Sequence, residues 1–256
     1  MLLQQTSEKM SQMRLHGMLR SLKERLDRPD HQDLSVSDLF SLVVDDEWNA
    51  RESRRLTSRL RTAQFKEKNA CIEDVDYRAT RGLKKSLVLE LAKNQWIEKK
   101  QNILITGPSG AGKSYLAQAL GHQACRDGHT VMYLRFPKLL IALTHAKADG
   151  SYSEYLGKLA KTKVLILDDL GLSPLEEPEQ RDLLEIVEDR YAVGSTIITS
   201  QLPVAAWHPF FGGERLADAI CDRVLHNAFR IEFSGVDSIR KERAQRDLTP
   251  GNKSEN

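Results

Sequence analysis

Cysteine is scarce in this chain, which has three in 256 residues, Cys71, Cys125 and Cys221. Because they are far apart and odd in number, the sequence excludes a disulfide-rich scaffold and shows no metal-ligand spacing. Long apolar runs are missing as well: no stretch is long enough to span a bilayer, and the first residues lack the apolar core of a secretory signal. We therefore expect a cytoplasmic protein with reduced thiols.

An excess of charge of either sign is also missing. Lys and Arg together number 38 and Asp and Glu 36, which gives a formal net charge of +2. A nearly neutral chain gives no overall argument for nucleic-acid binding, so that prediction has to come from local clusters. The length suits one or two domains and is enough to bury a sizeable core.

One glycine-rich stretch has the G-x-x-x-x-G-K-[ST] pattern of a phosphate-binding loop. An apolar run that looks like a buried strand, Ile103–Ile105, precedes it, and a helical pattern follows from Tyr115 to Ala124. In this position the loop can aim backbone N–H groups at phosphates, and the helix N-terminus adds positive potential. Lys113 can reach the outer phosphates and Ser114 can ligate Mg²⁺. The alternative is a plain glycine-rich turn. The expected nucleotide-binding residues are Gly107, Pro108, Ser109, Gly110, Ala111, Gly112, Lys113, Ser114 and Tyr115.

Two carboxylates follow a second apolar run. Val164–Leu167 has the pattern of a buried strand, and Asp168 and Asp169 come directly after it. Downstream of a phosphate loop, Asp168 is expected to hold Mg²⁺ through water and Asp169 to polarise the attacking water. The alternative is ordinary capping of a strand end. Asp169 is also one methylene shorter than the Glu that is usual at this place in related ATPases.

Polar residues also follow a third apolar run, Thr196–Thr199. Ser200 or Gln201 would lie beside the γ-phosphate, between the phosphate loop and the acidic strand, and could orient the water by hydrogen bonding. The alternative is a plain polar strand end.

Two arginines near the C-terminus are candidates for phosphate contact. Arg223, in the helical segment Leu216–Leu225, could stabilise transition-state charge at the γ-phosphate of a neighbouring subunit, or it could simply pair with Asp222. Arg240 is a second candidate, acting within the same chain.

From Asn102 onward apolar strands alternate with helices, which predicts an α/β fold with a parallel central sheet. The expected strands are Ile103–Thr106, Thr130–Leu134, Val164–Leu167, Thr196–Thr199 and Phe229–Phe233, and the expected helices are Lys113–Ala124, Pro137–Ala146 and Glu179–Ala192. A further helix is expected before the first strand, from Leu87 to Trp96.

The N-terminal part predicts a small all-α domain. Met and Leu residues recur at helical spacing from Met10 to Leu26, and a second helix is expected from Ser37 through Trp48 with Phe40, Val43 and Val44 on its apolar face. We interpret these stripes as the core of a small helical bundle. The expected divisions are a helical domain over 1–68, a linker and adenine-side segment over 69–101, an ATPase domain over 102–248 and a disordered tail over 249–256.

Two local clusters could contact DNA. Arg51, Arg55 and Arg59 are four residues apart and would share a helix face, with Arg54 and Arg61 nearby. Nucleic-acid or partner contact and a solvated surface are equally good interpretations of this cluster. The segment 137–161 predicts a helix, a break and a second helix between two strands, and its side chains suited to backbone phosphates include Lys138, Lys147, Tyr152 and Lys158. An ordinary solvated insertion is the alternative.

With these motifs the chain resembles the IstB-like helper ATPases of bacterial insertion sequences, within the AAA+ group that includes DnaC-type helicase loaders. The matching pieces are Gly107–Ser114, Val164–Gly171, Thr199–Pro203, Asp222–Asn227 and Leu15–Met18. The resemblance implies an AAA+ P-loop domain behind a small helical domain, with little or no C-terminal lid. It also implies Arg223 as the trans-acting arginine, Arg240 as a second sensor, and DNA contact through the segment 137–161. Since Ser200 and Gln201 depart from the Asn common at the first sensor, the sequence leaves open which of them acts.

The motifs thus predict an ATP- and Mg²⁺-dependent ATPase, and an arginine acting on a neighbouring subunit predicts a ring or filament. The resemblance implies that this assembly forms on double-stranded DNA and recruits or stimulates the transposase of the same element. A DnaC-like helicase loader is the alternative. A small-molecule kinase is a third interpretation, for which the sequence offers no obvious acceptor pocket.

Overall fold

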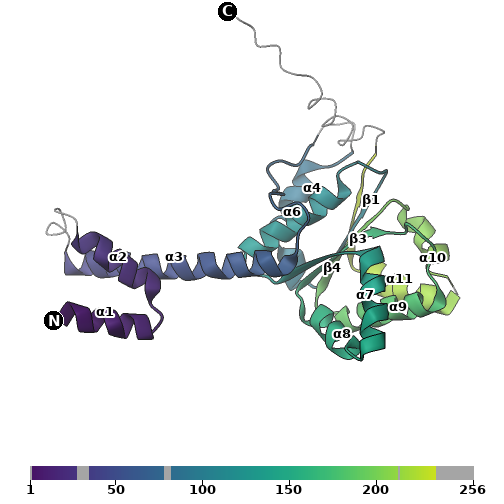
Figure 1. The fold of residues 1–256 in the computed structure, drawn as a ribbon. Helices are drawn as coiled ribbons and strands as arrows, with labels where there is room; N and C mark the ends of the chain where they lie inside the picture. Colours follow the sequence, from purple (N-terminus) through teal and green to yellow (C-terminus); the bar gives the residue numbers. More distant parts are fainter. Residues whose placement is uncertain (1, 28–34, 78–81, 213, 235–256) are drawn as a thin grey trace, which may run out of the picture. The chain divides into compact units, whose positions relative to one another are not determined.

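The computed structural model describes residues 2–27, 35–77, 82–212 and 214–234 (Figure 1). The predicted second sensor, Arg240, and the predicted disordered tail, 249–256, lie outside this part of the chain. The residues Arg28–Asp30, in which Pro29 predicts the end of the first helical segment, lie outside it as well.

The described chain forms two compact units, Met1–Ser58 and Arg59–Asn256, which we call unit 1 and unit 2. The division falls within one long helix, α3 (Val36–Ala63). It is a division by internal contacts, and the functional domains expected from the sequence, with a boundary at residue 68, stay a prediction.

Unit 1 is helical, with α1 (Leu2–Gln12), α2 (His16–Leu26) and the first part of α3. The single helical stretch expected up to Leu26 is wrong, because the chain turns at Arg14, whose φ is +59°. The Arg14 N–H donates to the Ser11 carbonyl and the Leu15 N–H to the Met10 carbonyl, both at 2.9 Å. This is the hydrogen-bond pattern that ends a helix at a left-handed residue.

Glycine allows α2 to lie close to α3. A Cβ on Gly17 would meet the Ala50 Cβ at 2.8 Å and a Glu47 carboxylate oxygen at 2.9 Å. Gly17 belongs to the Leu15–Met18 stretch that carried part of the family resemblance. The close packing of α2 on α3 explains why this stretch contains a glycine.

The apolar face expected on the second helix is correct only in part. Met10 and Val43 are buried, but Phe40 is 68% exposed and Trp48 is 63% exposed. The interpretation of the whole apolar stripe as bundle core is therefore wrong for Phe40, which lies on the solvent side of α3.

Unit 2 contains a five-stranded sheet in which every pairing is parallel, in the order β2-β3-β4-β1-β5. Figure 1 labels three of these strands, β1, β3 and β4. The predicted α/β fold with a parallel sheet is thus confirmed. The strands are β1 (Asn102–Thr106), β2 (Val131–Arg135), β3 (Val164–Leu170), β4 (Ser195–Ser200) and β5 (Ala228–Glu232).

Helices cover both faces of this sheet. On one face Leu104, Leu165 and Ile198 join a core cluster with side chains of the helices that follow β2 and β3. On the other face, which the alternation of strand side chains turns away from that core, α6 (Lys113–Arg126) packs closely enough that a Cβ on Gly121 would lie 2.8 Å from Ile166. The helices of the first face are α7 (Phe136–Asp149), α8 (Tyr152–Lys161), α9 (Glu177–Arg190), α10 (Trp207–Phe210) and α11 (Glu214–Leu225), with a short 3₁₀ turn, η3 (Val204–Ala206). Across the residues placed in the structure, no helix is both long and apolar enough to cross a membrane.

Two helix predictions have different outcomes. The predicted helix, break and helix between β2 and β3 is confirmed, because α7 ends at Gly150, with φ of +80°, and α8 follows. The single helix expected from Leu87 to Trp96 is wrong, because Asn94, with φ of +59°, separates α4 (Lys85–Leu91) from α5 (Gln95–Glu98). The Asn94 side chain donates to Asp127 at 2.7 Å, which holds this turn against the end of α6.

The register of the strands brings their carboxyl ends together. Thr106 at the end of β1 is opposite Ser200 at the end of β4, and Arg135 at the end of β2 is opposite Asp168 of β3. Ligands of open parallel sheets bind at this edge, and the predicted phosphate loop and both predicted acids lie there.

Candidate functional site

The loop between β1 and α6 is bent by three glycines in the left-handed region. Gly107, Gly110 and Gly112 have φ of +139°, +79° and +103°. A Cβ on Gly107 would also lie 2.7 Å from the Cβ of Phe233, and Gly112 is the N-cap of α6. The glycine positions of the motif therefore follow from backbone geometry and from close packing.

The amine of Lys113 is held inside this loop. Its Nζ donates to the carbonyls of Gly107 and Pro108, both at 2.8 Å, and the residue is only 6% exposed. A buried ammonium beside the N-terminus of a helix is an anion-binding arrangement, and a phosphate group is the ligand that its charge and donors suit.

Asp168 is 3% exposed and accepts a hydroxyl hydrogen bond from each of three elements. One carboxylate oxygen accepts from Ser114 at 2.7 Å and from Thr199 at 2.5 Å, and the other accepts from Tyr133 at 2.7 Å. Burial, reinforced by the hydrogen bond to Asp168, raises the pKa of Tyr133, so its hydroxyl stays a donor.

The pair of Ser114 and Asp168 has the chemistry of a magnesium site. A hydroxyl and a carboxylate are hard oxygen ligands, and they lie 2.7 Å apart directly after the phosphate loop. The described residues contain no group of three or more His, Cys, Asp or Glu that could hold a metal ion by themselves. Mg²⁺ is usually held by one or two protein oxygens together with substrate phosphates, and Ser114 and Asp168 could supply the protein oxygens.

Asp169 lies in an unusual backbone conformation beside Arg135. Its φ is +66°, and the pairing of β3 with β4 shifts register between Leu167 and Leu170. The Asp169 Oδ2 accepts from Arg135 Nε at 3.1 Å and from the terminal nitrogen Nη2 at 2.9 Å. In the described part of the chain no donor bonds to Oδ1, so one oxygen of Asp169 can accept a proton.

The residue of β4 that contacts Asp168 is Thr199, which the sequence analysis did not single out. The Ser200 hydroxyl donates to the Leu170 carbonyl at 2.7 Å and accepts from the Leu202 N–H at 3.0 Å, while Gln201 is exposed. The structure therefore brings Thr199 to Asp168, whereas the hydroxyl of Ser200 bonds to the backbone of Leu170, at the end of β3, and of Leu202.

Tyr133 and Arg135 of β2 were missed as well. Both lie on the strand next to β3, and the register that pairs Arg135 with Asp168 puts them at the site. The alternation of side chains along β2 could have shown that Tyr133 and Arg135 lie on the same face of the sheet. It could not have placed them beside Asp168, because that depends on the sheet order, in which β2 and β4 flank β3.

Arg223 lies at the opposite end of the sheet from the phosphate loop. Asn102, the first residue of β1, donates from its side chain to the Arg223 carbonyl at 3.3 Å. The loop leaves the other end of β1, about 13 Å away for a strand of this length. Within one chain, Arg223 is thus not part of the site around Lys113.

The guanidinium of Arg223 is held against α9. It pairs with Glu188 at 2.8 Å and with Asp222 at 3.1 Å, and it lies 5.8 Å from the centre of the Tyr191 ring. Its Nε is buried without a hydrogen-bond partner among the described residues. The predicted local pair with Asp222 is therefore present, as one of several contacts.

One face of α6 binds the segment that follows α3. The Glu67 N–H donates to the Gln118 side chain at 2.8 Å, and its carbonyl lies 3.0 Å from His122 Nε2. Phe65 stacks on the His122 ring at 4.1 Å, and the Tyr115 hydroxyl accepts from the Cys71 N–H at 3.3 Å. The structure thus places Tyr115 against this segment, and places the segment beside the helix that begins at the phosphate loop.

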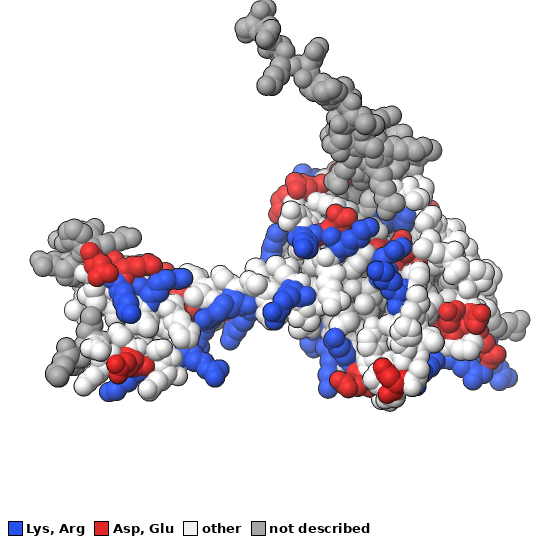
Figure 2. Space-filling view, in the orientation of Figure 1, with Lys and Arg blue, Asp and Glu red and all other residues white. Residues whose placement is uncertain are grey.

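The predicted DNA contacts of α7 and α8 fall into two groups. Lys147 pairs with Asp182 of α9 at 2.5 Å, and the Tyr152 hydroxyl donates to Asp182 and Glu185, both at 2.8 Å. Lys138 and Lys158 are exposed and have no acid within ion-pair distance in the described residues. Acidic and basic side chains are interspersed on the displayed face of unit 2 (Figure 2), which agrees with the near-zero net charge.

The predicted arginine cluster is divided between the two units. Arg51, Arg54 and Arg55 belong to unit 1, whereas Arg59 belongs to unit 2, where its Nε donates to the Cys125 carbonyl at 2.9 Å. All three arginines of the expected shared face lie at four-residue spacing on one continuous helix, α3, so that helix face is present.

Comparisons with known proteins extend the likeness over nearly the whole chain. A family model described as IstB-like ATP binding protein matches residues 8–247. The insertion sequence ATP-binding protein y4pL of Sinorhizobium fredii is 46% identical over 243 residues, which cover 95% of this chain and 99% of that protein. The IS1162 ATP-binding protein of Pseudomonas fluorescens is 46% identical over 203 residues, which cover 79% of this chain and 88% of that protein.

Solved structures share the fold at lower identity. The crystal structure of the DnaC helicase loader matches with a TM-score of 0.56 at 21% identity, and the match covers 65% of this chain and 97% of the DnaC chain. The structure of AMPPCP-bound DnaA from Aquifex aeolicus matches with a TM-score of 0.55 at 20% identity, and the match covers 72% of this chain and 56% of the DnaA chain.

Proposed function

Because this chain belongs to the family of IstB-like ATP binding proteins, we propose that it hydrolyses ATP and uses ATP to assemble on duplex DNA during insertion-sequence transposition. Its second unit has the AAA+ P-loop fold that the sequence predicted, with DnaC- and DnaA-like neighbours. The observation that carries the hydrolysis proposal is the contact of Ser114 with Asp168 at 2.7 Å, next to the buried amine of Lys113.

Each residue of the site has a role in this proposal. Lys113 and the backbone N–H groups of the loop bind the β- and γ-phosphates. Ser114 and Asp168 hold Mg²⁺, which neutralises charge on the phosphates when it is bound. Thr199 fixes the carboxylate of Asp168, and Asp169 takes the proton of the attacking water on its Oδ1, since Arg135 occupies Oδ2.

Arg223 acts on a neighbouring subunit in this proposal. It lies at the far end of β1 from its own loop, so a phosphate contact requires a second copy of the chain. For that contact its guanidinium exchanges Glu188 for the phosphate of the neighbour. A contact of this kind joins two different surfaces, so repeated copies form a closed ring or a helical filament.

The DNA and transposase parts of the proposal depend on the relatives. Those at 46% identity are named for insertion sequences, whereas the likeness to the DnaC helicase loader, at 21% identity, concerns the fold. One neighbour of the fold, with a TM-score of 0.54 and 20% identity, is the replication initiator DnaA bound to AMPPCP and single-stranded DNA. Because transposition inserts an element into duplex DNA, the insertion-sequence names of the relatives at 46% identity lead us to propose duplex DNA and the transposase of the same element as partners, and we prefer this to the helicase-loader alternative.

The test is the mass of the assembly with and without ATP and with and without duplex DNA, by light scattering. We expect large complexes when ATP and DNA are both present. Lys113→Ala is expected to lose both ATP binding and assembly, because the phosphates lose their buried cation. Asp169→Asn is expected to bind ATP and assemble but to hydrolyse it on the order of a hundredfold or more slowly, the range that general-base removal gives.

Other outcomes would contradict the proposal. A wild-type chain that stays monomeric in all four conditions has no ATP-dependent assembly. A chain that binds a hexameric helicase without DNA, and forms no large complex on duplex, is a helicase loader.

A further inference from the structure

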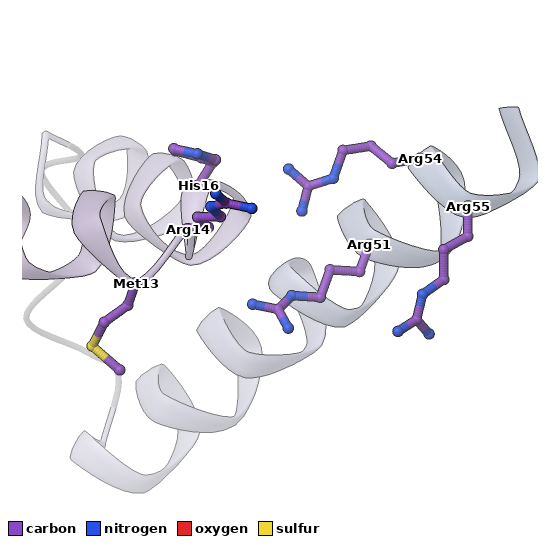
Figure 3. A pocket seen from close by; sticks show the side chains of 6 residues that line it. All are labelled: Met13, Arg14, His16, Arg51, Arg54 and Arg55. Atoms are coloured by element: carbon purple, nitrogen blue, oxygen red, sulfur yellow. The ribbon is translucent and has the colours of Figure 1, made fainter. Parts of the chain in front are cut away.

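Unit 1 contains a hollow lined almost entirely by cationic side chains. It has a volume of about 450 Å³, and its lining residues are Met13, Arg14, His16, Arg51, Arg54 and Arg55. Figure 3 shows Arg14, on the turn between α1 and α2, and His16, the first residue of α2, on one side and the three arginines of α3 on the other, with the Arg54 guanidinium directed toward the turn and the Arg55 side chain directed away from it. Positively charged groups from two elements therefore converge on one concave surface.

The acids near this hollow neutralise only part of its charge. Glu47, which is 5% exposed, accepts from Arg51 at 2.6 Å and lies 3.6 Å from Arg54, and Glu52 pairs with Arg55 at 2.7 Å. No acid among the described residues lies within ion-pair distance of Arg14. Four arginines thus face two carboxylates, and most of their N–H donors remain for a ligand.

The buried acid has a structural task that orients one of these arginines. A Glu47 carboxylate oxygen accepts from the Met18 N–H at 3.0 Å, in the first turn of α2, while the other accepts from the Arg51 Nε. Glu47 therefore joins the start of α2 to α3 and fixes the Arg51 fork at the hollow.

Arg14 occupies a backbone position that favours glycine. It is the left-handed residue that ends α1, with φ of +59°, and the turn is less stable with any other residue at this position than with glycine. Arg14 thus lines the hollow from a backbone position that glycine would occupy at lower cost.

We propose that this hollow is a phosphate-binding site that holds the sugar–phosphate backbone of duplex DNA. The inference rests on the proposed function and names the surface of unit 1 through which DNA would be bound. Arginine forks match phosphate oxygens in geometry and charge. The hollow offers them from both sides, which a row of arginines on one helix would not do.

The test is the salt dependence of the binding of a mixed-sequence duplex to the full chain, measured with a non-hydrolysable ATP analogue present. Arg14→Gly and Arg54→Gln are each expected to lower the slope of log affinity against log salt by about one, the value of one lost phosphate contact. Lys23→Gln removes a charge from the exposed side of α2 outside the hollow and is expected to keep the wild-type slope.

Arg14→Gly also separates a DNA contact from a purely structural role. Glycine suits the left-handed turn, so this variant is expected to melt at a higher temperature than wild type while it binds DNA more weakly. Lower stability together with weaker binding would overturn the assignment of Arg14.

Two further outcomes overturn the site. If the Arg14→Gly and Arg54→Gln variants keep the wild-type slope of log affinity against log salt, the hollow binds no phosphate. If they keep that slope but no longer bind the purified transposase, the hollow binds a protein. A wild-type chain that retains the nucleotide but binds no duplex at any salt concentration contradicts the proposed function as well as the site.

Discussion

At the scale of single residues, Asp168 is the side chain on which the site depends. It is almost fully buried, and the free energy cost of burying its charge is offset by hydroxyl donors from α6, β2 and β4. Among the residues that the structure describes, Tyr133 is the one donor to the second carboxylate oxygen, so it fixes the rotation of the carboxylate that accepts from Ser114. Partners of this kind orient a metal ligand without contacting the metal.

Tyr133→Phe removes this donor and keeps the ring. We expect the magnesium concentration for half-maximal ATP turnover to rise about tenfold, the lower part of the range for lost partners of metal ligands. ATP binding measured in the absence of magnesium is expected to be unchanged. The control is Tyr155→Phe, which removes the hydroxyl of a half-buried tyrosine on α8. An unchanged magnesium requirement in Tyr133→Phe would show that the bond to Asp168 has no functional role.

At the scale of elements, α6 connects the phosphate loop to the rest of unit 2. Its N-terminus follows Gly112, one face packs on β3 near Gly121, and another face binds the segment around Glu67 through Gln118 and His122. A shift of α6 therefore moves the N–H groups that are proposed to bind phosphate.

Gly121→Ala tests the close packing of α6. A Cβ there would meet Ile166 and Phe65, both at 2.8 Å, so we expect a loss of about 1–3 kcal/mol in the free energy of unfolding. Gly157→Ala on α8 is the matched control, because no atom lies within 4 Å of its Cβ. That variant is expected to gain about 0.5–1 kcal/mol from helix propensity. Equal effects in denaturant unfolding would contradict the packing at Gly121.

His122 makes the stability of this packing depend on pH. Burial lowers its pKa, against the opposing hydrogen bond with the Glu67 carbonyl, so the folded chain favours the neutral ring. The unfolded chain binds the proton first, at a pKa of about 6.5. The stabilisation is therefore fully present above that pH and is lost as the pH falls from there through the lower pKa of the folded state.

The measurement is denaturant unfolding on both sides of about pH 6.5. His122→Gln is expected to flatten the pH dependence in this window, whereas His145→Gln, at an exposed position of α7, is expected to leave it as in wild type. The interpretation is wrong if His122→Gln and wild type lose the same stability on acidification.

The sequence was most informative where function and local backbone geometry coincide. Gly107, Lys113 and Asp168 were predicted because the phosphate loop and the acidic strand each fit within a few residues. Tyr133 and Thr199 could not be assigned to Asp168 from the sequence, since their contacts depend on the order of parallel strands.

Chain turns and exposed apolar residues were the other source of error. Arg14 and Asn94 adopt left-handed conformations without the glycine that would have marked a helix end, so two helices were expected as continuous. Phe40 fits an apolar helical stripe yet is exposed, because the pattern shows periodicity and not which side of a helix is covered.

At the scale of the whole molecule, the two parts of the proposed ATPase site lie at opposite ends of the sheet. The phosphate loop follows the carboxyl end of β1, and Arg223 is held near the start of the same strand. In the proposed assembly one chain supplies half of each of two sites, and hydrolysis is expected only where the Arg223 end of one copy meets the loop end of another. Under this proposal ATP turnover depends on assembly on DNA.

Arg223→Ala is accordingly expected to bind ATP like wild type but to lose ATP turnover. Lys113→Ala is expected to lose ATP binding and, with it, turnover. The most direct test is to mix the two inactive variants and measure ATP hydrolysis with duplex DNA present. The account predicts that hydrolysis returns, because Lys113→Ala subunits supply Arg223 to the intact loops of their neighbours. A mixture as inactive as its components, or full turnover by Arg223→Ala alone, would contradict it.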